Sequence, residues 1–183
     1  MPNHSAYAKI IHEANVKAGW WTDLLTGESI IETRNIGELI SLIHSELDEA
    51  WEGAITNKSD DHLPKYLMFD VELADTVIRI YDLLGSRKID PADIPLSTFP
   101  INDNIAVSFC WIHYAITQAL EGFRQGDQAR AAVNLVAALR AVWDLAEKCG
   151  IKLESIMLEK LAYNAKRADH KLENRKLKNG KKF

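Results

Sequence analysis

The sequence predicts an all-α fold, a helical bundle with two helical hairpins followed by a C-terminal helix. Apolar residues recur at helical spacing through most of the chain, while alternating or β-branched runs bounded by turns are scarce. The 183 residues are 47% apolar and 26% charged, which is the balance of an ordinary globular protein. This length suffices for one domain with a core that needs neither disulfides nor a structural metal.

The first half of the chain predicts one short and two long helices. A short helix over residues 5–17 leads into a glycine-containing loop, and a long helix follows over residues 36–55. Pro64 suits the first turn of a second long helix that continues to about residue 84, where a glycine follows. Residues 36–85 are therefore expected to form the first hairpin.

The second half is expected to contain a similar hairpin after an extended connector. Residues 86–103 contain three prolines, too many for a continuing helix. Helices over residues 104–124 and 129–148, broken by Gly126, give a second hairpin over residues 104–149.

The C-terminal region is expected to hold a last helix over residues 153–169 and then a basic tail. Residues 171–183 have six Lys or Arg against one acid and few apolar residues. Such a tail is expected to stay mobile until a ligand binds it. Residues 1–170 are then one domain, of which the first hairpin carries the active residues.

The net charge, the cysteines and the N-terminus indicate which partners and which cellular compartment are expected. The formal net charge of −4 gives no global attraction to nucleic acid, so no nucleic-acid partner is expected. Cys110 and Cys149 stand singly and suggest a reducing cytoplasm. The N-terminus lacks the features of a signal peptide, and no apolar run approaches about 18 residues, so neither secretion nor a membrane span is expected.

Glu46 is the most informative acid of the first hairpin. At about 100° per residue, it falls inside the broad apolar arc of its helix, beside Leu42 and Ala50, and Glu49 lies at the edge of that arc. An ionised carboxylate on a core-facing stripe is costly unless it is paired or bound to a cation. Glu46 therefore requires a partner, either a bound cation or the other half of a buried ion pair, unless it lies at the rim of the interface and its carboxylate reaches solvent.

The second long helix carries a polar stripe on an otherwise apolar surface. Glu72, Asp75, Arg79 and Asp82 follow at i, i+3, i+7 and i+10. The remaining positions are apolar over well over half of the circumference, which indicates burial on several sides. Asp82, at the end of the stripe, is expected to face solvent.

Two pairs of acids on consecutive antiparallel helices can bring four carboxylates to one level of a bundle. The pairs are Glu46 with Glu49 and Glu72 with Asp75, with 22 residues between Glu49 and Glu72. Ligation by oxygen atoms alone suits Mg²⁺, with Mn²⁺ as a substitute, and Mg²⁺ usually also binds substrate phosphates. Iron is disfavoured, because the Glu-x-x-His motif of di-iron bundles is absent from these helices.

These motifs resemble those of the MazG-like, all-α nucleoside triphosphate pyrophosphohydrolase superfamily, whose signature is ExxE, a gap and then ExxD. The similar segments are Ser45–Ala50, Val71–Arg79 and the C-terminal segment Lys160–Arg167 with its Lys, Tyr-Asn and Arg. The resemblance implies a bundle of that family's type, Mg²⁺ bound by Glu46, Glu49, Glu72 and Asp75, and cleavage between the α- and β-phosphates. It also implies a homo-oligomer, a dimer or a tetramer.

The resemblance and the spacing together assign further roles. Glu49 is expected to act as the base that activates a water molecule. The phosphates are expected to bind a basic face of the last helix, where three residues recur at i, i+4 and i+7, and also Arg79; the three residues are Lys160, Asn164 and Arg167. Trp20 and Trp21 are candidates for stacking on a base, because adjacent indoles do not easily face one core.

The sequence leaves three questions of function open: the nucleotide preferred, a related reaction and a non-enzymatic role. The favoured nucleotide can be dUTP, dCTP, another nucleoside triphosphate or a damaged one. Phosphoribosyl-ATP hydrolysis belongs to the same superfamily, although the long second half argues against it. The third is a non-enzymatic helical interaction module, in which Arg79 pairs with the acids and the basic tail docks on an acidic partner or on nucleic acid.

Overall fold

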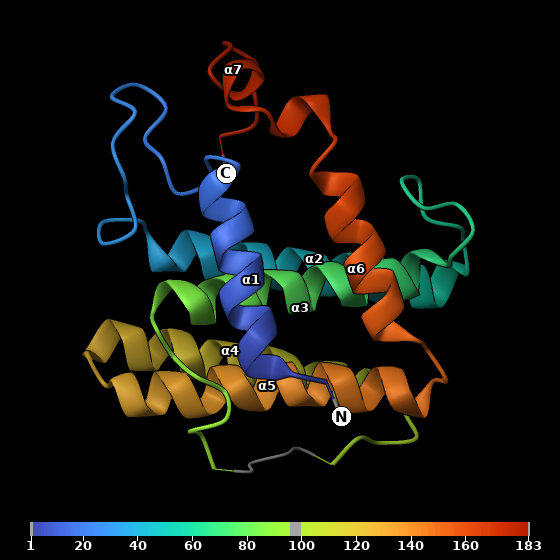
Figure 1. The fold of residues 1–183 in the computed structure, drawn as a ribbon. Coiled ribbons are helices and arrows are strands. Elements are labelled where there is room, and N and C mark those ends of the chain that lie inside the picture. Colours follow the sequence, from blue (N-terminus) through green and yellow to red (C-terminus); the bar gives the residue numbers. More distant parts are fainter. Residues whose placement is uncertain (1, 96–99, 183) are drawn as a thin grey trace.

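The computed structural model describes residues 2–95 and 100–182, and within these ranges the protein is all-helical (Figure 1), as the sequence predicts. The α-helices are α1 (His4–Lys17), α2 (Ile36–Thr56), α3 (Met68–Ser86), α4 (Ile105–Gln125), α5 (Gln128–Lys148), α6 (Leu153–Asn164) and α7 (Leu172–Arg175), with a 3₁₀ helix η1 (Ala168–His170) before α7. No helix in these ranges is both long and apolar enough to cross a membrane.

Helix α3 is the centre of the bundle. It packs along α2 in the first hairpin and contacts α5 of the second, while α1 and α6 cross over it (Figure 1). Val71, Tyr81 and Leu83 are at most 1% exposed and, at about 100° per residue, point to different sides of α3. Because neighbours surround the helix, well over half of its circumference is apolar, and its polar stripe is largely shielded: Glu72 is buried, and the side chains of Asp75 and Asp82 are 15% and 13% exposed.

Glycine lets the helices of both hairpins approach closely. A Cβ atom on Gly53 of α2 would lie 2.4 Å from the backbone nitrogen of Phe69 in α3. In the second hairpin, a Cβ atom on Gly122 of α4 would lie 2.5 Å from the backbone nitrogen of Ala131 in α5. The α2–α3 contact sets the distance between the helices that carry the acidic pairs.

Helix α3 begins at Met68 rather than at the predicted Pro64. Residues 58–67 form a closed loop instead, in which the Asp60 carboxylate accepts hydrogen bonds from the backbone nitrogens of His62 and Leu63 at 2.9 and 2.7 Å. The Met68 backbone nitrogen donates to the Lys58 carbonyl and closes the loop. The side chain of Asp60 therefore outweighs the helix-starting preference of proline.

The last helix is shorter than predicted, because α6 ends at Asn164. Arg167 is extended, and the chain then folds back through η1 and α7 toward residues 19–20. Arg175 is buried, with its guanidinium 3.7 Å from the centre of the Trp20 ring and its Nη1 donating to the Gly19 carbonyl at 2.8 Å. Part of the segment that is expected to be a mobile tail is thus packed against the body of the protein.

The connector between the hairpins is held by Arg140 of α5. Its guanidinium donates hydrogen bonds to the carbonyl oxygens of Pro91, Ile94 and Pro95. Residues 96–99 of the expected connector lie outside the described residues.

Candidate metal centre

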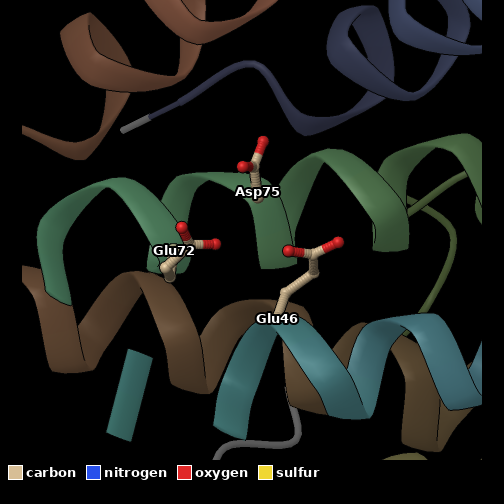
Figure 2. A group of neighbouring side chains, drawn as sticks. All are labelled: Glu46, Glu72 and Asp75. Atoms are coloured by element: carbon tan, nitrogen blue, oxygen red, sulfur yellow. The ribbon is translucent and has the colours of Figure 1, made fainter. Parts of the chain in front are cut away.

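Three acids of the first hairpin converge between α2 and α3. Glu46 comes from α2, whereas Glu72 and Asp75 come from successive turns of α3 (Figure 2). One carboxylate oxygen from each lies within 4.8 Å of those of the other two. Glu46 and Glu72 are buried, and the Asp75 side chain is 15% exposed. The arrangement offers several oxygen ligands to one hard cation.

One carboxylate oxygen of Glu72 has no hydrogen-bond partner among the described residues. This atom, Oε2, is buried. Burial, followed by the charges of Asp75 and Glu46, raises the pKa of Glu72 to about 9. A buried carboxylate oxygen without a partner is costly, so this atom requires either a proton or a cation.

Two basic side chains pair with the other acids. Arg79 donates from Nε to Glu46 Oε1 at 2.9 Å, and its Nη2 lies 2.8 Å from the same oxygen. Lys160, which is 2% exposed, has its Nζ 2.9 Å from Asp75 Oδ2. Burial raises the pKa of Asp75 to about 6, although the charge of Lys160 acts in the opposite direction.

Glu49 lies apart from this group of three. Its side chain is exposed and lines the edge of the same cavity. Partial burial and then the charge of Glu46 raise the pKa of the Glu49 carboxyl. Its position one turn beyond Glu46 on α2 places it beside the centre, where it can accept a proton from a water molecule.

A cavity of about 830 Å³ opens over the acids, a volume that fits a molecule of nucleotide size. Its acidic floor faces walls that carry basic side chains from α1, α3, α6, the loop before α2 and the C-terminal segment. These are Lys17, Arg34, Arg79, Lys160, Arg167, Lys171 and Lys181. Acids that hold a cation, surrounded by basic side chains, make a binding site for an anion chelated to a cation.

The structure places all the expected phosphate-binding residues on this cavity. Asn164 has a buried Oδ1 that makes no hydrogen bond, and Arg167 is paired with Asp169 at 2.6 Å. Arg167 lines the cavity from the turn after α6, not from the helix itself. The three residues line the same cavity, but the predicted i, i+4 and i+7 face of one helix does not extend to Arg167, which follows the end of α6.

The two tryptophans have different environments. Trp20 lines the cavity, but Arg175 covers one of its faces. Trp21 is 1% exposed and belongs to the core, so it has no free face for a base. Its Nε1 donates to Asp82 Oδ1 at 3.0 Å, and His12 Nδ1 lies 2.7 Å from the same oxygen. The prediction that Asp82 faces solvent is therefore wrong, since its side chain is 13% exposed and accepts hydrogen bonds from these two neighbours.

Sequence reasoning did not single out three further residues of the cavity. His62 has its Nδ1 3.4 Å from Lys160 Nζ, and burial followed by the charge of Lys160 lowers its pKa. His170 and Lys181, from the C-terminal segment, line the same cavity. No local pattern marks them, because their neighbours in the site are distant in sequence.

Comparison of the chain with protein-family models, with curated proteins and with solved structures found no match.

Proposed function

We propose that this protein is a Mg²⁺-dependent, MazG-like nucleoside triphosphate pyrophosphohydrolase, which converts a nucleoside triphosphate and water to the monophosphate and pyrophosphate. The observation that carries the proposal is the buried cluster of Glu46, Glu72 and Asp75. In it, Glu72 Oε2 has no partner, and the cavity above it is lined with basic side chains. The resemblance of the ExxE, ExxD and Lys-to-Arg segments supports the same reaction.

The residues present fit a magnesium ion. Glu46, Glu72 and Asp75 would hold it, with Glu49 at the edge of the site, and all donors are carboxylate oxygens of the kind that Mg²⁺ prefers. When bound, the ion supplies neutralisation of phosphate charge and a lower pKa for a water molecule. Mn²⁺ has similar preferences and is the expected substitute.

Side chains of the protein bind the phosphates, accept the proton from water and contact the nucleoside. Lys160, Arg79 and Arg167 bind the phosphate oxygens and hold the triphosphate in one orientation. Glu49, exposed at the cavity edge and with a raised pKa, accepts a proton from the attacking water. The apolar part of the cavity, which includes Leu39, Leu42 and Ile78, is left for the nucleoside.

The test is product analysis with purified protein and Mg²⁺. A panel of ribo- and deoxyribonucleoside triphosphates, with phosphoribosyl-ATP included, is incubated with the protein, and the phosphorus products are identified by NMR. Monophosphate and pyrophosphate are expected. Glu46→Gln should abolish the reaction, whereas Glu52→Gln, on the exposed side of α2 and paired with Lys58, should leave it unchanged. Diphosphate and inorganic phosphate, or activity that survives Glu46→Gln, would contradict the proposal.

A second candidate is a non-enzymatic helical interaction module. The ion pairs of Arg79 with Glu46 and of Lys160 with Asp75 favour it, because they neutralise two of the acids within the chain. This candidate leaves the unpartnered oxygen of Glu72 without a role. It requires that neither Mg²⁺ nor a nucleotide changes the melting temperature.

A further inference from the structure

The carboxylates of the metal centre are already engaged by the groups expected to bind phosphate. Arg79 contacts Glu46 Oε1 through two nitrogens at 2.8 and 2.9 Å. Lys160 contacts Asp75 Oδ2 at 2.9 Å. A guanidinium or ammonium that pairs with a carboxylate is not free to bind an anion.

A divalent cation would compete directly with these two side chains. Glu46, Glu72 and Asp75 bring their oxygens within 4.8 Å of one another, so a cation bound among them lies close to the nitrogens of Arg79 and Lys160. Like charges at such distances in a partly buried site repel one another strongly. Cation binding therefore favours a different position for both side chains.

We propose that Arg79 and Lys160 form a polyphosphate-binding site that is closed by their ion pairs and opens when a divalent cation takes over the carboxylates. The proposal rests on the proposed function, because it concerns the same metal centre. Its ligand is a di- or triphosphate chelated to the cation. Each ligand removes an obstacle to the other, so the two bind with positive cooperativity.

The surroundings of both side chains allow the exchange. Arg79 lines the cavity and its side chain is 36% exposed, so it can turn toward the open volume without unfolding α3. Lys160 also lines the cavity, and a second polar neighbour, His62 Nδ1, lies 3.4 Å from its Nζ.

Calorimetric titration separates the exchange from simple phosphate binding. Mg²⁺ alone is titrated into metal-free wild type, Lys160→Met and Arg79→Gln. An α,β-methylene nucleoside triphosphate, which is not cleaved between those phosphates, is then titrated with and without saturating Mg²⁺. Wild type is expected to bind the nucleotide with Mg²⁺ and about tenfold or more weakly without it.

The variants are expected to change the two affinities in opposite directions. Removing the charged side chain of Lys160 or Arg79, which competes with Mg²⁺ for the carboxylates, should tighten the binding of Mg²⁺ alone by about fivefold or more. The Mg²⁺-dependent binding of the nucleotide should weaken by about tenfold. Lys171→Met is the matched control: it removes the same charge from the same cavity, but Lys171 forms no ion pair with the three acids. It should leave the affinity for Mg²⁺ alone almost unchanged.

Three results would count against the exchange. If wild type binds Mg²⁺ but neither Lys160→Met nor Arg79→Gln binds it more tightly, the exchange is refuted and the proposed function stands. If Lys171→Met tightens Mg²⁺ binding equally, the effect is one of total charge and the exchange is again refuted. If wild type binds no divalent cation, both proposals fail. Arg79→Gln, at a partly exposed position, carries the test if Lys160→Met does not fold.

Discussion

Lys160 of α6 lies with its ammonium nitrogen 2.9 Å from Asp75 Oδ2 of α3, in a position that leaves only 2% of its side chain exposed. This ion pair ties the helix that follows the second hairpin to the acids of the first. The wall of the cavity that is expected to bind phosphate is therefore positioned by the acids expected to bind the cation.

Lys160→Ala should destabilise the metal-free protein by about 3 kcal/mol, because it leaves a mostly buried carboxylate without its partner. Urea unfolding in the presence of EDTA measures the change. Lys166→Ala, at an exposed position just after α6, is the control and should change the free energy of unfolding by less than about 0.5 kcal/mol. Equal effects of the two substitutions would show that the ion pair contributes nothing.

The pKa of Glu72 predicts how the stability of the metal-free protein depends on pH. Burial raises this pKa from 4.5 to about 9, so the folded state holds a proton that the unfolded state releases. This contribution to stability is complete below about pH 4.5 and is lost as the pH rises toward about 9.

Glu72→Gln should therefore stabilise the metal-free protein by about 2 kcal/mol at about pH 8 and flatten the decline of stability above about pH 5. Urea unfolding across this pH range, with EDTA present, provides the measurement. Glu52→Gln, at an exposed site, should keep the wild-type profile. A Glu72→Gln profile parallel to that of wild type would mean that Glu72 titrates normally.

Substitution of the two contact glycines distinguishes a loss of helix packing alone from a loss that also disturbs the geometry of the acidic site. Gly53→Ala and Gly122→Ala place a methyl group 2.4 and 2.5 Å from a backbone nitrogen in the facing helix, and each should cost about 1–3 kcal/mol. Gly53→Ala should also weaken Mg²⁺ binding, because it moves α2 relative to α3, which together carry the three acids. Gly122→Ala should not. Mg²⁺ titration below the melting temperature distinguishes them, and equal losses of affinity would contradict this account of the site.

Arg175→Ala should release the C-terminal segment from the cavity. The substitution removes the stacking on Trp20 and the hydrogen bond to the Gly19 carbonyl. Amide hydrogen exchange in residues 168–182 should accelerate, and the KM for the nucleotide should rise, because Lys181 lines the cavity. Lys176→Ala, an exposed neighbour, is the control. Unchanged exchange in Arg175→Ala would show that the stacking does not hold the segment.

The local features of the sequence predict helices close to α1–α5 and place Glu46, Glu72 and Asp75 on facing helices, but they predict neither the end of α6 nor α7. Glu46 stands out because its position on the helical wheel is apolar, and the structure buries it beside Glu72 and Asp75. The i, i+3 spacing of Glu72 and Asp75 fixes them on one side of α3 wherever that helix begins. The error at Pro64 therefore left the predicted acids in place.

The features that depend on distant contacts could not be predicted. The Asp82 side chain is only 13% exposed because Trp21 and His12, from the N-terminal region, contact it. Arg175 is buried through contacts that include a hydrogen bond to Gly19, and Gly19 lies 156 residues earlier in the chain. An isolated helix pattern cannot reveal which neighbours will cover a polar stripe or a basic tail, since that depends on the packing of the whole chain.

Binding of a divalent cation by the α2–α3 acids is the central claim, and a Mg²⁺ titration of the melting temperature at about pH 8 tests it most directly. Wild type should melt at a higher temperature as Mg²⁺ is added. Glu46→Gln, Glu72→Gln and Asp75→Asn should each show little or no increase, while Glu52→Gln should respond like wild type. A wild-type melting temperature that does not change with Mg²⁺, or an equal increase in all the variants, would contradict the claim.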